Sequence, residues 1–393
     1  MDIDLIREDF PLLDNIAYLD NAATSLSPEP VIRAMNEFER HYRSNVGRGV
    51  HRLTTIATQR YWDSHIKVAE LIGGEDGTTV LTKNTTEAIN MVACGLEWHS
   101  GDNIVTTVLE HHSNFLPWVH LRKKGIGVST IEPFPDGMID ISAFESAINE
   151  NTGLVALTHA SNVLGNVLPV KEIASICQEH GARLLIDGAQ SVPHISVDVK
   201  KTGCDYFCFS GHKMLGPTGT GILWMKETDI DPLLLGGGAI DKVSLDSYTL
   251  AEGYQRYEAG TPNIAGMIGL GYAVDYLRKV GMDNIERHEK KLTEKVIHGL
   301  EDMEQVHVYG PVEKSARIGV VSFNIEGMHP HEVSHILDEG SDMITRSGEH
   351  CCHPLMEYMG LPNGTVRISM YLYNTEEEID LLLATIEEIT RRL

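Results

Sequence analysis

The alternation of short β-rich runs with helical patterns between residues 78 and 225 constrains the fold more than any other feature of this chain. Such alternation is typical of a largely parallel sheet, in which helices connect successive strands. Two of the runs, residues 154–160 and 183–189, are apolar on both faces, as expected for central strands that helices cover on each side. The sequence therefore predicts an α/β fold with a mostly parallel central sheet. Its strands are expected in TVLTK, NIVTTV, GVSTIEPF, LVALTHA, RLLIDGA, YFCFSG and GILWMK.

A loop-like stretch, residues 233–263, separates this region from a helical one that begins near Ile264. Beyond it, ARIGVVSFNIE and TVRISMYLY are typical of strands, and PHEVSHILDEG and EEEIDLLLATIEEITRRL are typical of helices. At 393 residues the chain is long enough for two domains. We expect a large domain over residues 16–265 and a small α+β domain formed by residues 1–15 and 266–393.

The charge of the chain argues against some classes of partner. Counting 32 basic against 56 acidic residues gives a net charge of −24, which repels nucleic acids and anionic lipids. The N-terminus is acidic and no apolar run approaches the ~20 residues of a membrane span, so we expect a cytoplasmic protein. The six cysteines are too few for a disulfide scaffold and should mostly stay reduced.

Lys213 is the first candidate for chemistry, because it follows the predicted strand DYFCFS and precedes the glycine-rich run 216–221. A lysine can form a Schiff base with an aldehyde cofactor such as pyridoxal 5′-phosphate (PLP). The small residues around it would let a phosphate approach the backbone. A surface lysine before a glycine-rich turn is the alternative explanation of this pattern.

Asp187 and Gln190 strengthen the PLP interpretation. Asp187 ends an apolar strand, so its carboxylate should lie at the carboxyl edge of the sheet. An anion paired with the pyridine nitrogen keeps PLP an effective electron sink, and Gln190 could donate to the phenolic oxygen of the ring. An aspartate that caps the following helix is the alternative.

Two further motifs could contact the cofactor. The run NTTEAIN, residues 84–90, should begin a helix whose N-terminus favours a phosphate, although a simple capping box would look the same. The run EHHSN, residues 110–114, follows a predicted strand and could stack an imidazole on the pyridine ring. A metal-binding pair of histidines is the alternative, but the run supplies no clear third ligand.

A cluster of two thiols, two imidazoles and a guanidinium occupies residues 345–354. The cluster lacks C-x-x-C spacing and a second half, so we expect neither a zinc nor an iron–sulfur site. We favour a nucleophilic thiolate on a glycine-containing loop, stabilised by the positive charge of Arg346 or His350. An inert buried pair of cysteines is the alternative.

Together these motifs resemble the cysteine desulfurases of the class V aminotransferase family, in particular their SufS-like branch. The resemblance implies a PLP-dependent fold of the aspartate aminotransferase type (type I) and a homodimer with active sites at the subunit interface. It also implies conversion of L-cysteine to L-alanine, with the sulfur passed to an acceptor or scaffold protein in iron–sulfur cluster assembly. It covers almost the whole chain through YLDNAAT, TTEAIN, EHHSN, ASNVLGN, DGAQSV, FSGHKMLGPTGTGIL, YEAGTPN, RSGEHCCHPLM and VRISMYLYNT.

The same resemblance gives individual residues a role. Lys213 would be the Schiff-base lysine, His111 the imidazole that stacks on PLP, and Cys351 the sulfur acceptor that becomes a persulfide. Arg367 would clamp the substrate carboxylate, with Arg346 and Asn162 also near the substrate. The other cofactor contacts would be Thr85, Thr86, Asn162, Asp187, Gln190, Ser210, His212 and, across the dimer interface, Thr261.

Three positions depart from the family's pattern. Gly47 stands where many relatives carry histidine, so contacts at the dimer interface could differ. Glu349 replaces a frequent histidine two residues before Cys351, where a carboxylate opposes thiolate formation. Cys352 adds a second thiol, which could relay the persulfide or only fill space.

Two other functions are open on the sequence alone. A selenocysteine lyase or another PLP-dependent β-lyase would share every cofactor residue, and replacement of Cys351 would separate these enzymes from a desulfurase. A non-catalytic scaffold or sulfur carrier could also keep the fold, although Lys213 and Asp187 are both present.

Overall fold

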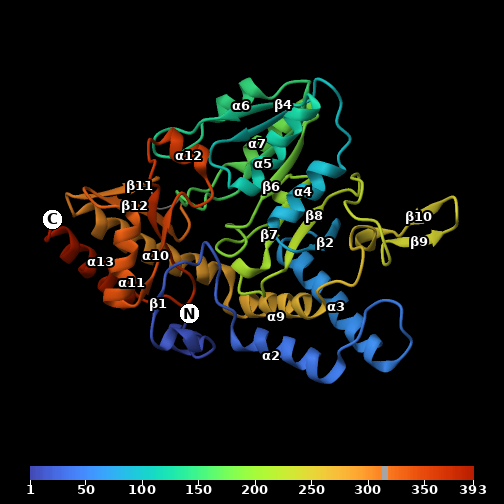
Figure 1. Ribbon diagram of the computed structural model, residues 1–393, viewed down its shortest axis with the longest axis horizontal. Helices are drawn as coiled ribbons and strands as arrows, with labels where there is room; N and C mark the ends of the chain where they lie inside the picture. The colour runs from blue at the N-terminus through green and yellow to red at the C-terminus, as the bar shows by residue number, and fades with distance from the viewer. Residues whose placement is uncertain (312–316) are drawn as a thin grey trace.

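The computed structural model describes residues 1–311 and 317–393, and a seven-stranded sheet lies at its centre (Figure 1). The strand order is β2-β8-β7-β6-β5-β3-β4, and only β8 runs against its neighbours. The sheet confirms all seven strands expected from the sequence. They are β2 (Thr78–Thr82), β3 (Asn103–Thr107), β4 (Gly127–Ile131), β5 (Thr152–Thr158), β6 (Arg183–Asp187), β7 (Tyr206–Ser210) and β8 (Gly221–Met225).

Helices cover both faces of this sheet, which is why its central strands are apolar on each side. In β5, Leu154 and Ala156 pack with α4 (Thr85–Gly95) and α5 (Leu116–Leu121), while Val155 and Leu157 pack with helices of the opposite face. The helices on that side are α3 (Arg52–Leu71), α7 (Val170–His180) and α9 (Ile264–Val280), and α2 (Glu29–Glu37) packs against α9. Two short helices, α6 (Ile141–Ala147) and α8 (Val199–Thr202), complete this region.

A second, four-stranded antiparallel sheet lies toward the other end of the molecule. Its order is β11-β12-β15-β14, and α10 and α13 pack against it through a separate apolar core. The expected strands are confirmed as β12 (Val320–Ile325) and β15 (Thr365–Ser369), and the expected helices as α10 (Met282–Glu301), α11 (Pro330–Ser341) and α13 (Glu376–Thr390). The region also contains β11 (Val306–Tyr309), β14 (Arg346–Gly348) and α12 (His353–Tyr358), which were not expected.

The N-terminal segment joins the two regions. After α1 (Ile3–Arg7), β1 (Ala17–Tyr18) pairs in parallel with β13 (Met343–Ile344). Arg7 of α1 forms an ion pair with Glu378 of α13 at 2.7 Å. The division into domains at residues 265 and 266 stays a prediction, and α9 shares the core of the large sheet while α10 contributes to the core of the small one.

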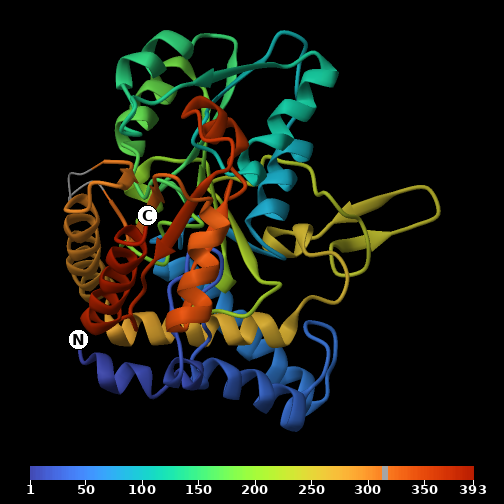
Figure 2. The ribbon, with the colours of Figure 1, turned by 60° about the vertical axis from the view of Figure 1, so that its left-hand side comes forward.

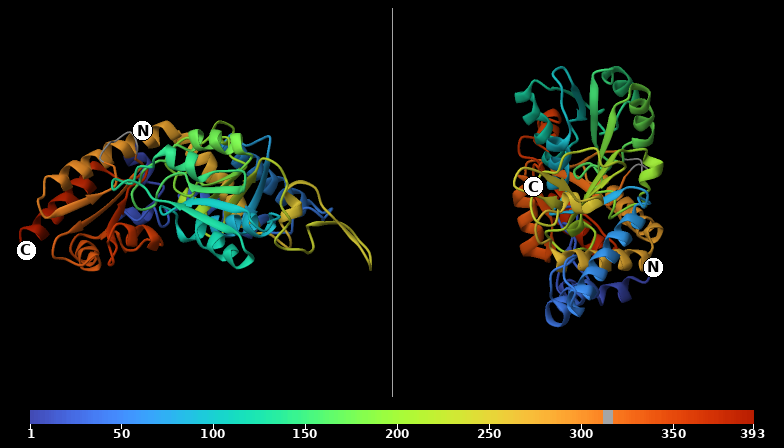
Figure 3. Two further views of the ribbon diagram at one scale, coloured as in Figure 1. Left: turned by 90° about the horizontal axis from the view of Figure 1, so that it is seen from above. Right: turned by 90° about the vertical axis from the view of Figure 1, so that its right-hand side faces the viewer.

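The stretch expected to be a loop contains a hairpin of β9 (Ile240–Val243) and β10 (Tyr248–Leu250). Figures 2 and 3 show it standing away from the body of the molecule. Its residues are mostly exposed and follow no apolar alternation, so the sequence carries little strand signal there. The short 3-10 or π turns are η1 (Pro11–Asp14), η2 (Phe38–Tyr42), η3 (His112–Asn114), η4 (Arg122–Lys124), η5 (Gly211–Lys213) and η6 (Gly253–Tyr257).

Among the described residues, no helix combines the length and the apolar character that crossing a bilayer requires.

Candidate active site

The predicted site residues come from the carboxyl edge of the large sheet and from the neighbouring small sheet. Asp187 is the last residue of β6, and Lys213 lies in η5 directly after β7. Asn162 follows β5 in a buried turn. Arg367 lies in β15, and Cys351 lies between β14 and α12. Parallel strands end together at this edge, so the fold brings side chains distant in sequence to one place.

The Lys213 amine is the electrostatic centre of the site. Burial, with a smaller contribution from the charge of Arg367, lowers its pKa to about 8, although Asp187, Cys352 and Cys351 act in the opposite direction. Charges on residues of both sheets therefore act on one amine. A lysine with such a pKa has a substantial neutral fraction near neutral pH and can act as a base or nucleophile.

Asp187 is a buried carboxylate that accepts one hydrogen bond from the described residues. The backbone N–H of Ala189 donates to its Oδ1 at 2.9 Å. Burial raises the pKa of Asp187, and the positive charge of Lys213 partly offsets that effect. A buried anion in this state favours a cationic partner.

Gln190, three residues later, is oriented by the N-terminal segment. Its Nε2 donates to the Ala22 carbonyl oxygen at 2.8 Å, while its Oε1 is buried without a hydrogen-bond partner among the described residues. The amide that was expected to donate to a cofactor is therefore engaged with the backbone in this structure. The oxygen is the group that still lacks a partner.

His111 lies after β3 and is a neutral imidazole. Its Nδ1 accepts from the Ser113 backbone N–H at 3.1 Å, and lies 3.0 Å from the Ser113 hydroxyl. Burial lowers the pKa of His111 to about 3, and the charge of Lys213 contributes. An uncharged ring of fixed orientation suits stacking rather than ion pairing.

The predicted phosphate ligands meet at the N-terminus of α4. The Ser210 hydroxyl accepts from the Thr85 backbone N–H at 2.9 Å and lies 2.6 Å from the Thr85 hydroxyl. Asn84 caps the helix by accepting from the Glu87 N–H at 3.0 Å. The structure thus contains the helix start that the sequence predicted, including the cap that was its simpler explanation.

Two other predicted phosphate ligands are less buried. The exposed Thr86 hydroxyl lies 2.6 Å from that of Ser113, on the turn that carries His111. The His212 ring lies 3.3 Å from the Thr24 hydroxyl, and burial lowers its pKa to about 4. His212 is therefore neutral and could offer a hydrogen bond but no charge.

Arg367 is buried and held by two partners. Its Nη2 donates to Asp20 Oδ1 and its Nη1 to the Asn162 carbonyl oxygen, both at 3.0 Å. Its Nε is buried with no hydrogen-bond partner in the described part of the chain. Arg346 is half exposed and approaches the other Asp20 oxygen at 3.8 Å. Two guanidinium groups are thus gathered on one carboxylate.

Cys351 is an exposed thiol on a tight turn. The φ angles of His350 and Cys351 are +51° and +57°, in the left-handed region. The His112 backbone N–H donates to the Cys351 carbonyl oxygen at 2.8 Å, which fixes the turn to the η3 segment. A solvent-accessible thiol is what transfer of sulfur to another protein needs.

One part of the charge prediction for this loop is wrong. His350 is buried against Thr365, and burial together with Arg367 lowers its pKa to about 2, so it carries no positive charge to stabilise a thiolate. The Glu349 carboxylate pairs with His353 at 2.5 Å, and its effect on the Cys351 thiol stays a prediction. Arg346 is the cation of this cluster that keeps its charge.

Thr261 and Gly47 lie outside the site of their own chain. Thr261 is exposed on the loop between η6 and α9, and no hydrogen bond among the described residues joins it to the site. Gly47 has a φ of +86° and open space around it, and its N–H donates to the Thr58 hydroxyl at 2.9 Å.

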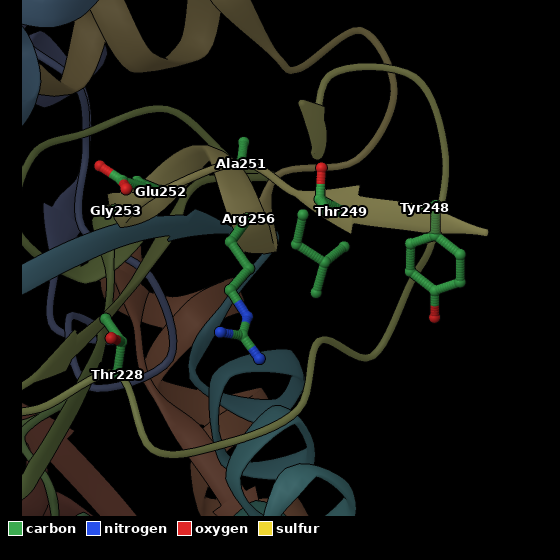
Figure 4. Close-up of a pocket in the computed structure, with 8 residues that line it drawn as sticks. Thr228, Tyr248, Thr249, Ala251, Glu252, Gly253 and Arg256 are labelled. Carbon is green, nitrogen blue, oxygen red and sulfur yellow. The ribbon is translucent and has the colours of Figure 1, made fainter. Parts of the chain in front are cut away.

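A separate hollow lies beside the β9–β10 hairpin and contains none of the predicted site residues (Figure 4). Figure 4 shows the Arg256 guanidinium pointing into it from η6, with the side chains of Thr249 and Tyr248 along β10. Among the described residues, no group of three or more His, Cys, Asp or Glu side chains could hold a metal ion.

Sequence reasoning gave no role to two carboxyl groups of the site. Asp20 lies in the YLDNAAT run, which carried the resemblance, yet its contact with Arg367 joins residues 347 positions apart. Glu110 begins the EHHSN run and is fully buried, with the Thr107 hydroxyl and the Asn114 amide donating to it at 2.7 and 2.6 Å. A charged residue directly after an apolar strand was the only available signal.

Comparison with known proteins identifies the family of this chain. The aminotransferase class-V family matches residues 17–382. The probable cysteine desulfurase of Pyrococcus abyssi is 46% identical over 395 residues, which cover 99% of this chain and 98% of that protein. This chain belongs to the cysteine desulfurases of the class V aminotransferase family.

Solved structures support the same family and confirm the fold class. The apo structure of a cysteine desulfurase from Thermococcus onnurineus has a TM-score of 0.97 and 45% identity, covering 100% of this chain and 99% of that one. The cysteine desulfurase CsdA from Escherichia coli has a TM-score of 0.92 and 30% identity, with the same coverage of both chains.

Proposed function

We propose that this protein is a PLP-dependent cysteine desulfurase that converts L-cysteine to L-alanine and receives the sulfur as a persulfide on Cys351. The observation that carries the proposal is the pairing of an exposed thiol with a buried amine of lowered pKa, Lys213, whose charge interacts with that thiol. The full-length likeness to cysteine desulfurases supports it.

The residues of the site fit PLP. Asp187 is a buried carboxylate that would pair with the pyridine nitrogen. Three residues later, Gln190 Oε1 is buried without a hydrogen-bond partner among the described residues, so a polar group of the cofactor could bind there. His111 would stack on the ring, Asn162 would lie near its phenolic oxygen, and Lys213 would hold it covalently. The phosphate would lie among Thr85, Thr86, Ser210 and His212 at the N-terminus of α4. When bound, PLP supplies an electron sink for the carbanion formed at the substrate α-carbon.

The protein's own groups would then move the protons and bind the substrate. Lys213, once released, takes the α-proton of L-cysteine, a role suited to an amine with a pKa of about 8. Arg367 would bind the substrate carboxylate, because no described residue forms a hydrogen bond with its Nε and its other nitrogens are fixed by Asp20 and Asn162. Arg346 would add positive charge at the entrance.

The sulfur step follows from the position of the thiol. The Cys351 thiolate attacks the substrate sulfur, so an S–S bond forms while the Cβ–S bond breaks. The electron pair left on Cβ takes up a proton, and alanine leaves. The Cys351 thiol is thereby oxidised to a persulfide and the carbon fragment is reduced, without any external oxidant.

The persulfide would next be delivered to a sulfur-acceptor or scaffold protein, which we expect to serve iron–sulfur cluster assembly. The exposure of Cys351 on the surface supports direct transfer of the sulfur to such a protein. We also propose that the protein is a cytoplasmic homodimer in which Thr261 of each subunit reaches the phosphate of the other. Thr261 is exposed, as that arrangement requires.

Detection of alanine and of protein-bound persulfide after addition of L-cysteine tests the proposal. The wild-type protein and Cys94→Ala, which removes another exposed thiol, should form both products, whereas Cys351→Ala should form neither. Sulfide release that is undiminished in Cys351→Ala would indicate a β-lyase instead. Strong preference for selenocysteine over cysteine would indicate a selenocysteine lyase. Failure to gain the visible absorbance of lysine-bound PLP would favour a scaffold without catalysis.

A further inference from the structure

The thiol next to the proposed nucleophile has a different environment. Cys352 is completely buried and belongs to the same apolar core as Leu355 and Met356. Burial raises its pKa well above the usual range, so it stays protonated. Its S–H donates to Asn162 Oδ1 at 3.2 Å. A protonated, inaccessible thiol is a poor nucleophile and a poor exit for sulfur.

The hydrogen bond from Cys352 contributes to the orientation of the Asn162 amide. With Oδ1 directed to the thiol, Nδ2 donates to the His350 carbonyl oxygen at 2.9 Å. An amide turned by half a revolution would set its oxygen against that carbonyl oxygen and its NH2 group against a donor. The thiol and the His350 carbonyl oxygen therefore favour the same orientation, the one in which Asn162 holds the loop.

The held loop is a strained one. His350 and Cys351 both adopt left-handed φ angles, which side-chain-bearing residues disfavour, so surrounding contacts must maintain them. Three contacts do this: Asn162 on the His350 carbonyl, Thr365 on the His350 ring, and the His112 N–H on the Cys351 carbonyl. The direction of the Cys351 thiol depends on this turn.

We propose that Cys352 is a positioning residue: its buried S–H orients Asn162, and Asn162 holds the His350–Cys351 turn that aims the reactive thiol. Cys352 is then neither a sulfur relay nor a simple space filler. The inference rests on the proposed function, because it takes Cys351 to be the sulfur acceptor. The hydrogen bond joins residues 190 positions apart and links the loop to the large sheet.

Three substitutions at residue 352 separate the hydrogen bond from the volume of the side chain. Cys352→Ser keeps a donor, whereas Cys352→Ala and Cys352→Val remove it, the latter without leaving a large cavity. Cys177→Ala is the matched control, because Cys177 is a buried thiol of the same core cluster on α7. The first readout is the rate at which iodoacetamide alkylates Cys351 in the protein without PLP or substrate, followed by mass spectrometry.

We expect Cys352→Ala and Cys352→Val to raise the alkylation rate by about threefold to tenfold, the range that loss of one hydrogen bond allows, because the turn loosens. Cys352→Ser and Cys177→Ala should stay close to wild type. In an Asn162→Ala background, Cys352→Ala should have no further effect, since both act through one contact. Equal rates for the serine and alanine variants, or an equal change in Cys177→Ala, would overturn the proposal.

Turnover gives the second readout. With PLP and L-cysteine, Cys352→Ala should lower kcat by about threefold to tenfold and leave KM within about twofold, while Cys352→Ser recovers most of kcat. Fragment masses should place the persulfide on Cys351 alone, and a persulfide on Cys352 of the wild type would overturn the inference. If wild type forms no alanine, the proposed function fails, and the alkylation rates still decide the role of Cys352.

Discussion

Glu110, which directly precedes His111, shows how strongly burial acts on a single carboxyl group. Burial raises its pKa to about 8, although the Thr107 hydroxyl and the Asn114 amide both lower it. In the unfolded chain the pKa of a glutamate lies near its usual value of 4.5. The folded protein therefore binds this proton over a pH range in which the unfolded chain has already lost it.

The consequence is a loss of stability as pH rises. Below the unfolded pKa the group is protonated in both states and costs nothing, and from there up through about pH 8 ionisation increasingly favours unfolding. Glu110→Gln removes the ionisation and keeps the shape. We expect wild type to lose on the order of 1 kcal/mol or more, about 2 °C in Tm, between pH 5 and 8 relative to the variant.

Thermal unfolding of both proteins at fixed concentration and a series of pH values measures this difference. Other groups titrate equally in the two proteins, so the difference between their Tm values isolates Glu110. A constant difference across the range would show that Glu110 is ionised in the folded protein.

Residue roles could be predicted from sequence only where a motif is local. Lys213, Asp187 and Cys351 each stand next to a strand end or a glycine-containing loop, and the structure gathers all three. The neutral state of His350 could not be predicted, because its burial by Thr365 and its exposure to the charge of Arg367 arise from the small sheet. Likewise, the partners of Arg367 lie 205 and 347 positions away.

At the scale of elements, the loop that carries Thr261 is anchored through Glu258. Its buried carboxylate accepts from the Tyr61 hydroxyl and the Leu81 N–H, both at 2.6 Å, and from His65 Nε2 at 2.9 Å. These donors belong to α3 and β2. One carboxylate thus ties the loop to a helix and to the edge of the sheet.

Glu258→Ala should be strongly destabilising, because it leaves three donors without their acceptor. We expect the free energy of unfolding to fall by about 3 kcal/mol or more, the usual loss when one partner of a buried charged contact is removed. Tyr61→Phe removes a single donor and should cost about 1 kcal/mol. Urea unfolding at constant protein and PLP concentration provides the comparison, and equal losses in the two variants would contradict the anchoring role of Glu258.

Strands could be predicted from the sequence where burial imposes a pattern of apolar side chains. The strands of the large sheet have the apolar runs that helices on both faces impose, so all of them were found. The β9–β10 hairpin was missed because most of its side chains are exposed and nothing selects an alternation. Its existence depends on backbone pairing, which the side-chain pattern does not report.

For the whole molecule, the exposed apolar surface of this hairpin points to association. Val243 and Leu245 are 75% and 102% exposed, and Tyr248 lies on the same hairpin, beside the hollow of Figure 4. Large apolar side chains that project from a soluble domain usually mark an interface. The proposed homodimer would cover them and bring Thr261 to the neighbouring site.

A mixing experiment tests whether Thr261 acts across the interface. Lys213→Ala and Thr261→Asp should each abolish turnover as homodimers, the second by placing a carboxylate against the phosphate. In a mixed dimer, the site with an intact Lys213 receives the intact Thr261 of the Lys213→Ala subunit. After subunit exchange at equal amounts, roughly a quarter of wild-type activity should return, because half the dimers are mixed and each has one complete site. If Thr261 served its own chain, every site would keep one defect, and no activity would return on mixing.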